Sequence, residues 1–166
     1  MAGRFQLRPV AVPATPALRF AEFLNAAGKR LTAQRQLIVD EVFSHHDHFD
    51  VEELLDHLRP LLAARKVSRP TVYRTLNELV DAGLLRRMTL GARSVYEHDY
   101  GYPSHDHLYC QQCNRLIEFH SVELERIRDA VAKEYHFCVS SHRMFITGTC
   151  DDCRRRQKNA SAKDNG

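Results

Sequence analysis

The fold is decided by the stretch SRPTVYRTLNELVDAGLLRRMTLGARSVYEH, residues 68–98. Ser68 can cap the start of a helix, and Pro70 suits its first turn, where a missing amide hydrogen costs little. Four apolar residues then recur at helical spacing: Val72, Leu76, Leu79 and Val80. Gly83 is placed to end the helix, because glycine readily adopts the left-handed conformation found there. The pattern therefore predicts a helix between Ser68 and Gly83.

The period of the pattern changes directly after this helix. Residues 84–90 and 93–97 read as two short strands, and the tight turn between them contains Gly91 and Ala92. A hairpin that follows a recognition-type helix is typical of a wing. In a helix-turn-helix protein the second helix lies in the DNA major groove, led by its N-terminal residues. The stretch therefore favours a winged helix-turn-helix.

The residues before this stretch also read as helical, in short pieces that begin near Ala17. Asp50 and Glu53 have the form of a capping box, in which each side chain accepts a hydrogen bond from the other residue's amide. The apolar residues that follow recur at helical spacing: Val51, Leu54, Leu55, Leu58 and Leu62. This helix is expected to bury one face against the rest of its domain.

Six side chains are candidates for contacts with DNA. They lie at the start of the predicted recognition helix or near an earlier helical segment: Arg69, Thr71, Tyr73, Arg74, Lys29 and Arg30. An arginine can pair with guanine through two hydrogen bonds, and a tyrosine ring can pack against a thymine methyl group. The two earlier cations can hold the phosphate backbone or reach into a minor groove. By periodicity alone, the alternative that Tyr73 is a core aromatic and Arg74 a surface cation carries equal weight.

Charge supports DNA binding through its distribution rather than its total. The net charge of the chain is only +3, but residues 65–93 hold seven lysines or arginines against two acids. A charge run alone more often marks a solvated face. Its coincidence with the helix and hairpin favours a nucleic-acid partner.

Length and composition bound the class of protein. The 166 residues are 43% hydrophobic, which is enough for one medium domain or two small ones. The first sixteen residues contain three prolines and no apolar run long enough for a signal peptide or a membrane span. They are expected to form a loose arm on a soluble, cytoplasmic protein.

Four of the five cysteines form two Cys-x-x-Cys pairs: Cys110, Cys113, Cys150 and Cys153. Structural Zn(II) takes four such ligands in a tetrahedron, and each pair can deliver two thiolates to one ion. Redox-active or merely buried thiols are the weaker alternative, because a thioredoxin-like motif needs only one pair. Cys138 lies apart in an apolar stretch and is expected to be a small buried residue.

A second group of metal ligands lies just before the first cysteine pair. In the run His105-Asp106-His107, strand geometry would point the two histidines to one face and the aspartate to the other. Histidines and carboxylates suit Fe(II), Mn(II), Zn(II) or Co(II) better than copper(I). A single histidine is usually a surface residue. Two histidines at strand spacing beside a cysteine pair make a metal-binding role as well supported as a structural one.

Together these residues resemble the ferric uptake regulator family. The likeness covers about residues 17–153 and rests on three motifs: Thr71-Val72-Tyr73-Arg74-x-Leu76, Ser94-Val95-Tyr96-Glu97 and His105-Asp106-His107-Leu108-x-Cys110-x-x-Cys113. The resemblance implies a homodimer that binds palindromic double-stranded operator DNA when loaded with metal. Such a protein represses transcription of genes for metal homeostasis, iron above all.

The resemblance also assigns metal ligands, residue by residue. The structural zinc ligands are the four paired cysteines. The regulatory site, for Fe(II) or for Mn(II) or Zn(II), matches His48, Glu97, His105, His107 and Glu118. A further metal site in the family matches Asp106, Glu125 and His142. A histidine often precedes the triplet in the family, but Ser104 stands there in this chain.

The predicted fold class is α+β, with an N-terminal winged helix-turn-helix domain and a C-terminal α/β dimerisation domain. Each part has an expected range: a flexible arm over 1–16, the DNA-binding domain over 17–99, a hinge over 100–104, the dimerisation and metal-binding domain over 105–153, and a disordered basic tail over 154–166. In the second domain we expect two strands flanking Cys110 and Cys113, a helix carrying Leu124, and a strand over residues 139–149.

Other functions are weaker. The glutamates at positions 97 and 118 favour an iron-type regulator over the peroxide-sensing branch, which usually has aspartates there, and the zinc-sensing branch departs at the regulatory ligands. A metallohydrolase would need an open coordination position and a placed base, and no motif supplies them. A zinc-stabilised regulator indifferent to other metals is a further alternative. No enzymatic activity, small-molecule substrate or membrane partner is expected.

Overall fold

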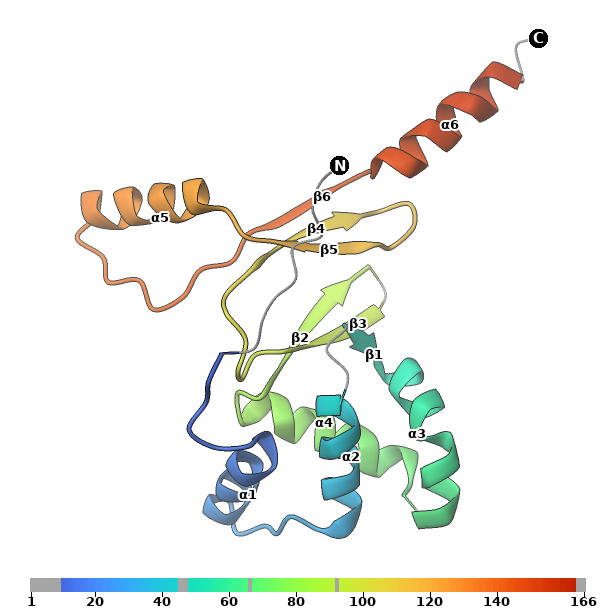
Figure 1. Cartoon of the computed structure of the whole chain (residues 1–166), viewed down its shortest axis with the longest axis vertical. Helices are drawn as coiled ribbons and strands as arrows, with labels where there is room; N and C mark the ends of the chain where they lie inside the picture. The colour runs from blue at the N-terminus through green and yellow to red at the C-terminus, as the bar shows by residue number, and fades with distance from the viewer. Residues whose placement is uncertain (1–9, 45–47, 66, 92, 164–166) are drawn as a thin grey trace. The chain divides into compact units, whose positions relative to one another are not determined.

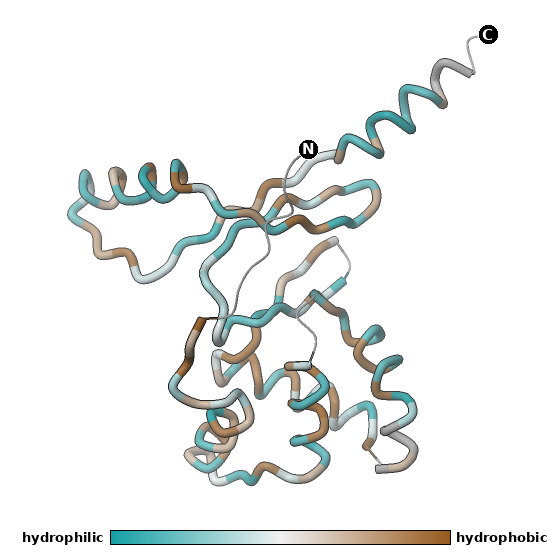
Figure 2. Tube along the Cα trace, viewed as in Figure 1, coloured by the Kyte–Doolittle hydropathy of each residue, from teal (hydrophilic) through white to brown (hydrophobic). Residues whose placement is uncertain are grey.

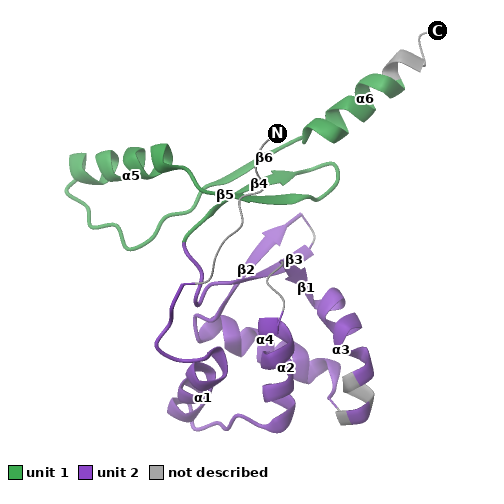
Figure 3. Ribbon diagram, in the orientation of Figure 1, with its two compact units in different colours: residues 1–7, 104–166 green, residues 8–103 purple. Residues whose placement is uncertain are grey.

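The computed structural model describes residues 10–44, 48–65, 67–91 and 93–163. The described residues divide into two compact units at Pro103 and Ser104 (Figure 3). We refer to residues up to 103 as the N-terminal unit and to residues from 104 as the C-terminal unit. None of the described helices combines the length and the apolar character needed to cross a bilayer.

Four helices build the N-terminal unit (Figure 1): α1 (Pro16–Ala26), α2 (Ala33–Ser44), α3 (Val51–Arg65) and α4 (Arg69–Asp81). They enclose one hydrophobic core, in which Phe20 of α1, Leu58 of α3 and Leu76 of α4 are fully buried. The predicted apolar faces of α3 and α4 are therefore confirmed at the described positions. The side chain of Leu62, also predicted to be buried, lies outside the described residues.

The ends of α4 follow the predicted signals. The Ser68 hydroxyl accepts a hydrogen bond from the Thr71 amide at 3.3 Å, and Pro70 lies in the first turn. At the other end, Gly83 has φ +67° and its amide bonds to the Val80 carbonyl, while the Leu84 amide bonds to the Leu79 carbonyl. This pair of bonds is a Schellman motif, which satisfies carbonyls that the helix would otherwise leave unpaired.

The start of α3 is the predicted capping box. The Asp50 amide donates to Glu53 Oε2 at 2.8 Å, and the Glu53 amide donates to Asp50 Oδ1 at 2.9 Å. Both orphan amides at the helix start are thus paired within the chain.

The wing is a sheet of three antiparallel strands in the order β1-β3-β2: β1 (Phe49–Asp50), β2 (Leu85–Leu90) and β3 (Arg93–His98). The hairpin is in register from Leu85 opposite His98 to Leu90 opposite Arg93. Gly91 begins the turn with φ +63°, and Ala92 lies outside the described residues. The predicted hairpin is confirmed.

The segment before α1 departs from the predicted loose arm. Its first nine residues lie outside the described part of the chain. The next residues are held by hydrogen bonds: the Val10 amide donates to the Gly101 carbonyl at 2.8 Å, and the Tyr100 hydroxyl donates to the Ala14 carbonyl at 3.0 Å. Tyr100 and Gly101, expected in the hinge, thus belong to the N-terminal unit.

The C-terminal unit contains a three-stranded sheet in the order β5-β4-β6, with strands β4 (Asp106–Cys110), β5 (Leu116–Phe119) and β6 (Phe145–Gly148), and helix α5 (Val122–Glu134). β5 pairs antiparallel with β4, and β6 pairs parallel with it. The strand predicted over residues 139–149 is shorter, because β6 pairs with β4 only from Phe145 to Gly148. The Asp106 carboxylate accepts the Met144 amide at 2.7 Å just before that pairing begins.

The prediction that the basic tail is disordered is wrong for the part of the tail that the structure describes. Residues Asp151–Lys163 form helix α6, which Figure 2 shows as largely hydrophilic. Asp151 lies in the first turn, where a carboxylate favours the helix dipole, and it pairs with Arg154 and Arg155 one turn along at 2.6 Å each. A prediction based on polarity alone does not take these local charge interactions into account.

Replacing Leu76 tests the core of the N-terminal unit. Because its side chain is fully buried, Leu76→Ala should lower the free energy of unfolding by about 2–5 kcal/mol, measured by urea denaturation of the zinc-loaded protein. Asn77→Ala, at an exposed neighbouring position, is the control and should change stability by less than about 0.5 kcal/mol. Equal effects of the two variants would contradict the placement of α4.

Candidate metal and DNA-binding sites

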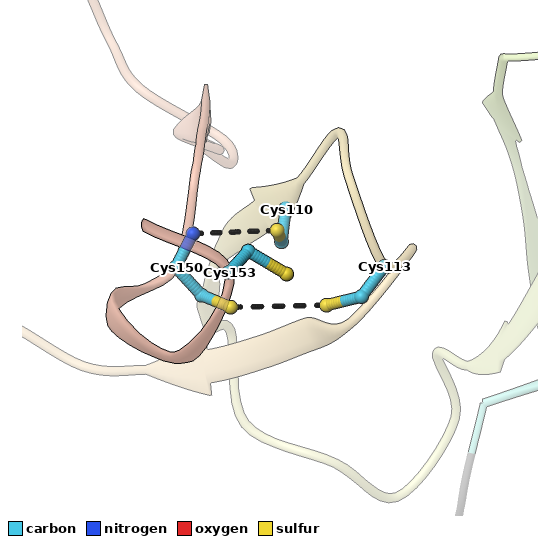
Figure 4. Close-up of side chains that lie close together, drawn as sticks. All are labelled: Cys110, Cys113, Cys150 and Cys153. Atoms are coloured by element: carbon cyan, nitrogen blue, oxygen red, sulfur yellow. Dashed lines mark hydrogen bonds between the residues drawn. The ribbon is translucent and has the colours of Figure 1, made fainter. Parts of the chain in front are cut away.

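The four paired cysteines converge in the C-terminal unit (Figure 4). One pair lies at the end of β4 and in the turn that follows it, and the other opens α6. Parallel pairing sets Cys110 opposite Gly148, so the second pair begins two residues beyond that position. All four sulfur atoms lie within 4.8 Å of one another.

This cluster fits Zn(II). With a zinc–sulfur distance of about 2.3 Å, sulfurs of a regular tetrahedron lie about 3.8 Å apart. The sulfur atoms of Cys113 and Cys150 are separated by 3.8 Å. The turn between the first two ligands places Asn114 at φ +58°, a conformation that asparagine tolerates better than most residues.

Hydrogen bonds to two of the sulfur atoms favour the thiolate form, which is the form that binds metal. The Cys150 amide donates to Cys110 Sγ at 3.3 Å, and this donation lowers the pKa of the Cys110 thiol to about 6. Burial raises the pKa of the Cys153 thiol to about 11, and Arg156 opposes that rise by donating to its sulfur at 3.0 Å. A bound cation would offset the burial cost, because zinc binds thiolates.

A second cluster of ligand atoms lies in the same unit. His107 stands opposite Glu118 in the β4–β5 register, and His105 precedes β4. Their ligand atoms lie within 4.8 Å of one another, and the two imidazole centroids are 4.7 Å apart. Both histidines are buried. Two imidazoles and one carboxylate are a set suited to Fe(II), Mn(II) or Zn(II).

The N-terminal unit brings together the other two predicted regulatory residues. His48 Nε2 lies 3.3 Å from Glu97 Oε2, and Glu97 is only 3% exposed. Arg86 donates to the other carboxylate oxygen at 3.2 Å. A buried carboxylate is costly unless it is paired, and this one has partners on both oxygens.

The ligands predicted for a further metal site do not form a cluster among the described residues. Among the described residues, Asp106, Glu125 and His142 do not bring three ligand atoms together. Asp106 Oδ2 lies 3.7 Å from His142 Nε2, while Glu125 is 3.4 Å from the His120 ring.

The outward face of α4 carries the predicted DNA-reading residues. Tyr73 and Arg74 are exposed, so the alternative of a core tyrosine is wrong. Arg69 forms an ion pair with Glu52 of α3, and the Tyr73 hydroxyl donates to the same carboxylate at 3.4 Å. Thr71 is half-buried beside the cap.

The two earlier cations differ in their surroundings. Lys29 Nζ lies 2.8 Å from Glu78 of α4, which is buried, and Arg35 contacts the same carboxylate at 2.9 Å. Lys29 therefore already holds the recognition helix. Arg30 is exposed, and its carbonyl accepts a hydrogen bond from Arg35.

Comparisons with known proteins identify the family of this chain. A family model described as the ferric uptake regulator family matches residues 26–147. The chain belongs to the ferric uptake regulator family. It is 30% identical over 140 residues to the ferric uptake regulation protein of Campylobacter upsaliensis, covering 84% of this chain and 90% of that protein. It is 31% identical over 131 residues to the peroxide-responsive repressor PerR of Staphylococcus epidermidis, covering 79% and 85%.

Solved structures give the same picture. The ferric uptake regulator of Pseudomonas aeruginosa, solved with manganese, matches with a TM-score of 0.66 and 26% identity, over 78% of this chain and 96% of that one. The expected α+β fold is thus confirmed. Members of this family are dimeric, metal-responsive regulators that bind DNA and control transcription.

The positions or contacts of four residues were not predicted from the sequence. Cys138 is exposed, so its prediction as a buried residue is wrong; it lies outside regular structure between α5 and β6. Glu78 was counted only as an acid in a basic region, although it anchors two cations. Arg86 and Arg128 contact predicted metal ligands, and no spacing motif marks such partners.

Removing one cysteine tests the zinc site. Cys113→Ser should lose the tightly bound zinc ion and melt at a lower temperature, because three thiolates no longer close the tetrahedron. Zinc content by plasma mass spectrometry and melting by circular dichroism measure both effects. Cys138→Ser removes an exposed thiol outside the cluster and should keep zinc and stability. Zinc retained by Cys113→Ser, or lost by Cys138→Ser, would contradict the assignment.

Proposed function

We propose that this chain is an iron-responsive repressor of the ferric uptake regulator family. The observation that carries the proposal is the cluster of the buried His105 and His107 with the half-buried Glu118, whose donor atoms suit Fe(II) and Mn(II). The Campylobacter upsaliensis relative is named for ferric uptake, which supports iron as the regulated metal. A cytoplasmic location follows from a DNA target and from the reduced thiols that zinc requires.

The family resemblance assigns five ligands to one regulatory ion. We assign to it His105, His107 and Glu118 of the C-terminal unit, and His48 and Glu97 of the N-terminal unit. Within their own unit, His48 and Glu97 are already 3.3 Å apart. Imidazole must be neutral and carboxylate ionised to bind a metal, and Arg86 donates to only one oxygen of the Glu97 carboxylate, the one that does not face His48. Zn(II) would be held separately by the four cysteines.

Such an ion would couple metal to DNA by restricting the hinge. If the metal-bound arrangement sets the two recognition helices of a dimer one helical turn of DNA apart, metal shifts the population toward the form that binds operator. In each protomer Tyr73 and Arg74 would read bases, while Arg69, Thr71 and Arg30 would contact the backbone. Lys29 would act mainly by holding α4 through Glu78.

The C-terminal unit supplies a surface for the second copy. Large apolar side chains on it are exposed in the single chain, including Leu108, Ile117, Ile127, Val131, Phe145 and Ile146. An apolar surface of this kind in a soluble protein normally contacts a partner. We assign it to the homodimer that is general in the family.

Other responses within the family are less well supported. The peroxide-responsive relative shows that sequence likeness alone does not choose the signal. Glu97 and Glu118 favour the iron-type regulator, and the zinc-sensing branch of the family departs at the regulatory ligands. We propose no enzymatic activity and no small-molecule substrate, because the sequence has no motif that would supply a placed base or a nucleophile beside the regulatory ion.

Binding to operator DNA at fixed ionic strength tests the proposal. Zinc-loaded protein should bind a palindromic AT-rich operator at least about tenfold more tightly with Fe(II) or Mn(II), a coupling of about 1.4 kcal/mol. His105→Ala/His107→Ala should lose this gain while keeping its zinc. His57→Ala, which removes an exposed histidine of α3, should behave like the wild type. A gain that survives in the double variant would refute the assigned site, and absent operator binding would refute the repressor.

A further inference from the structure

The third group of predicted metal ligands is held by an arginine. Arg128 lies on α5 one turn after Glu125, and its Nη1 donates to Nδ1 of His142 at 2.9 Å. The same nitrogen lies 3.9 Å from Glu125 Oε1. Its Nε donates to Asp129 at 2.8 Å, which fixes the plane of the guanidinium group. A permanent cation therefore stands among the side chains that would bind a divalent one.

This contact determines which nitrogen of His142 carries a proton. Arginine has only donors, so Nδ1 must present its lone pair to Arg128. A neutral imidazole then carries its single proton on Nε2. Protonated Nε2 has no lone pair for a metal ion, although it is the nitrogen that lies 3.7 Å from Asp106 Oδ2. His142 cannot accept from Arg128 and bind metal through Nε2 as a neutral ring.

The other two carboxylates are also engaged. Asp106 Oδ1 accepts the Met144 amide at 2.7 Å, which ties the start of β4 to the residue before β6. Glu125 lies 3.4 Å from the His120 ring and close to Arg128. With Ser104 at the position where the family often has a histidine, the residues present do not fit a third metal ion.

We propose that Arg128 replaces the third metal ion in this chain. Its guanidinium group links α5 to the segment before β6 through His142, and Asp106 lies next to the same ring. A metal site performs such cross-linking only when metal is available, whereas an arginine does so permanently. This chain should then hold two kinds of metal ion, structural and regulatory, and its C-terminal unit should keep this cross-link when metal is scarce.

Metal counting in a background without the regulatory site tests the proposal. Zinc-loaded His105→Ala/His107→Ala protein, titrated with Mn(II) and followed by electron paramagnetic resonance, should bind no Mn(II) tightly. Adding His142→Ala should change nothing. One tightly bound Mn(II) per chain that His142→Ala removes would overturn the proposal. Because this background lacks the regulatory ligands, the result does not depend on whether the proposed function is right.

Removing the arginine gives the second arm. In the same background, Arg128→Ala should melt at a lower temperature without added metal and should gain a weak Mn(II) site that needs His142. Arg126→Ala removes an exposed arginine from the same helix and should do neither, which controls for helix charge. If Arg128→Ala and Arg126→Ala melt alike and neither binds Mn(II), Arg128 is only a surface cation and the proposal fails.

Discussion

The C-terminal unit depends on the parallel pairing of β4 with β6, because that pairing brings the two cysteine pairs together. Among its described residues, the only buried side chains classed as hydrophobic are Cys110 and Cys153. The N-terminal unit, in contrast, buries a continuous core built from all four of its helices. A unit without an apolar core needs another source of stability. Structural zinc contributes about 10–16 kcal/mol in small zinc-binding peptides, which is comparable to the whole stability of a small domain.

This constraint would explain why structural zinc and the proposed dimer surface belong to the same unit. The zinc cross-link joins the end of β4 and the turn after it to the start of α6. The two cysteine pairs are separated in the sequence by thirty-six residues, 114–149. The exposed apolar side chains of the sheet and α5 would be buried by a second copy in the proposed dimer. In the proposed dimer each protomer would present a zinc-stabilised surface to its partner, while helix α4 belongs to the unit that has its own hydrophobic core.

Much of this was predictable from local sequence. The capping box at Asp50, the cap at Ser68 and the turn at Gly83 each act within a few residues, so the helices of the N-terminal unit followed from the printed order of side chains. The cysteine pairs were predictable because zinc chemistry restricts ligand type and spacing. The family motifs supplied the assignments that spacing alone left open.

Part of what could not be predicted from the sequence depends on contacts between distant residues. Arg128 meets His142 and Lys29 meets Glu78 only because the chain folds back on itself. The tail became helical through ion pairs within one turn, which a composition argument overlooks. Cys138 was placed by its apolar neighbours, yet that stretch lies outside regular structure and is exposed.

The central claim is that a regulatory ion and operator DNA act on the same equilibrium of this chain. Thermodynamic linkage makes such coupling reciprocal, so DNA must change metal affinity by the factor by which metal changes DNA affinity. The direct measurement is the Mn(II) dissociation constant of the zinc-loaded protein, by calorimetry, with saturating operator and with unrelated DNA of equal length. The account predicts tighter Mn(II) binding with the operator, by the same factor that Mn(II) tightens operator binding. An Mn(II) affinity indifferent to the operator would contradict it.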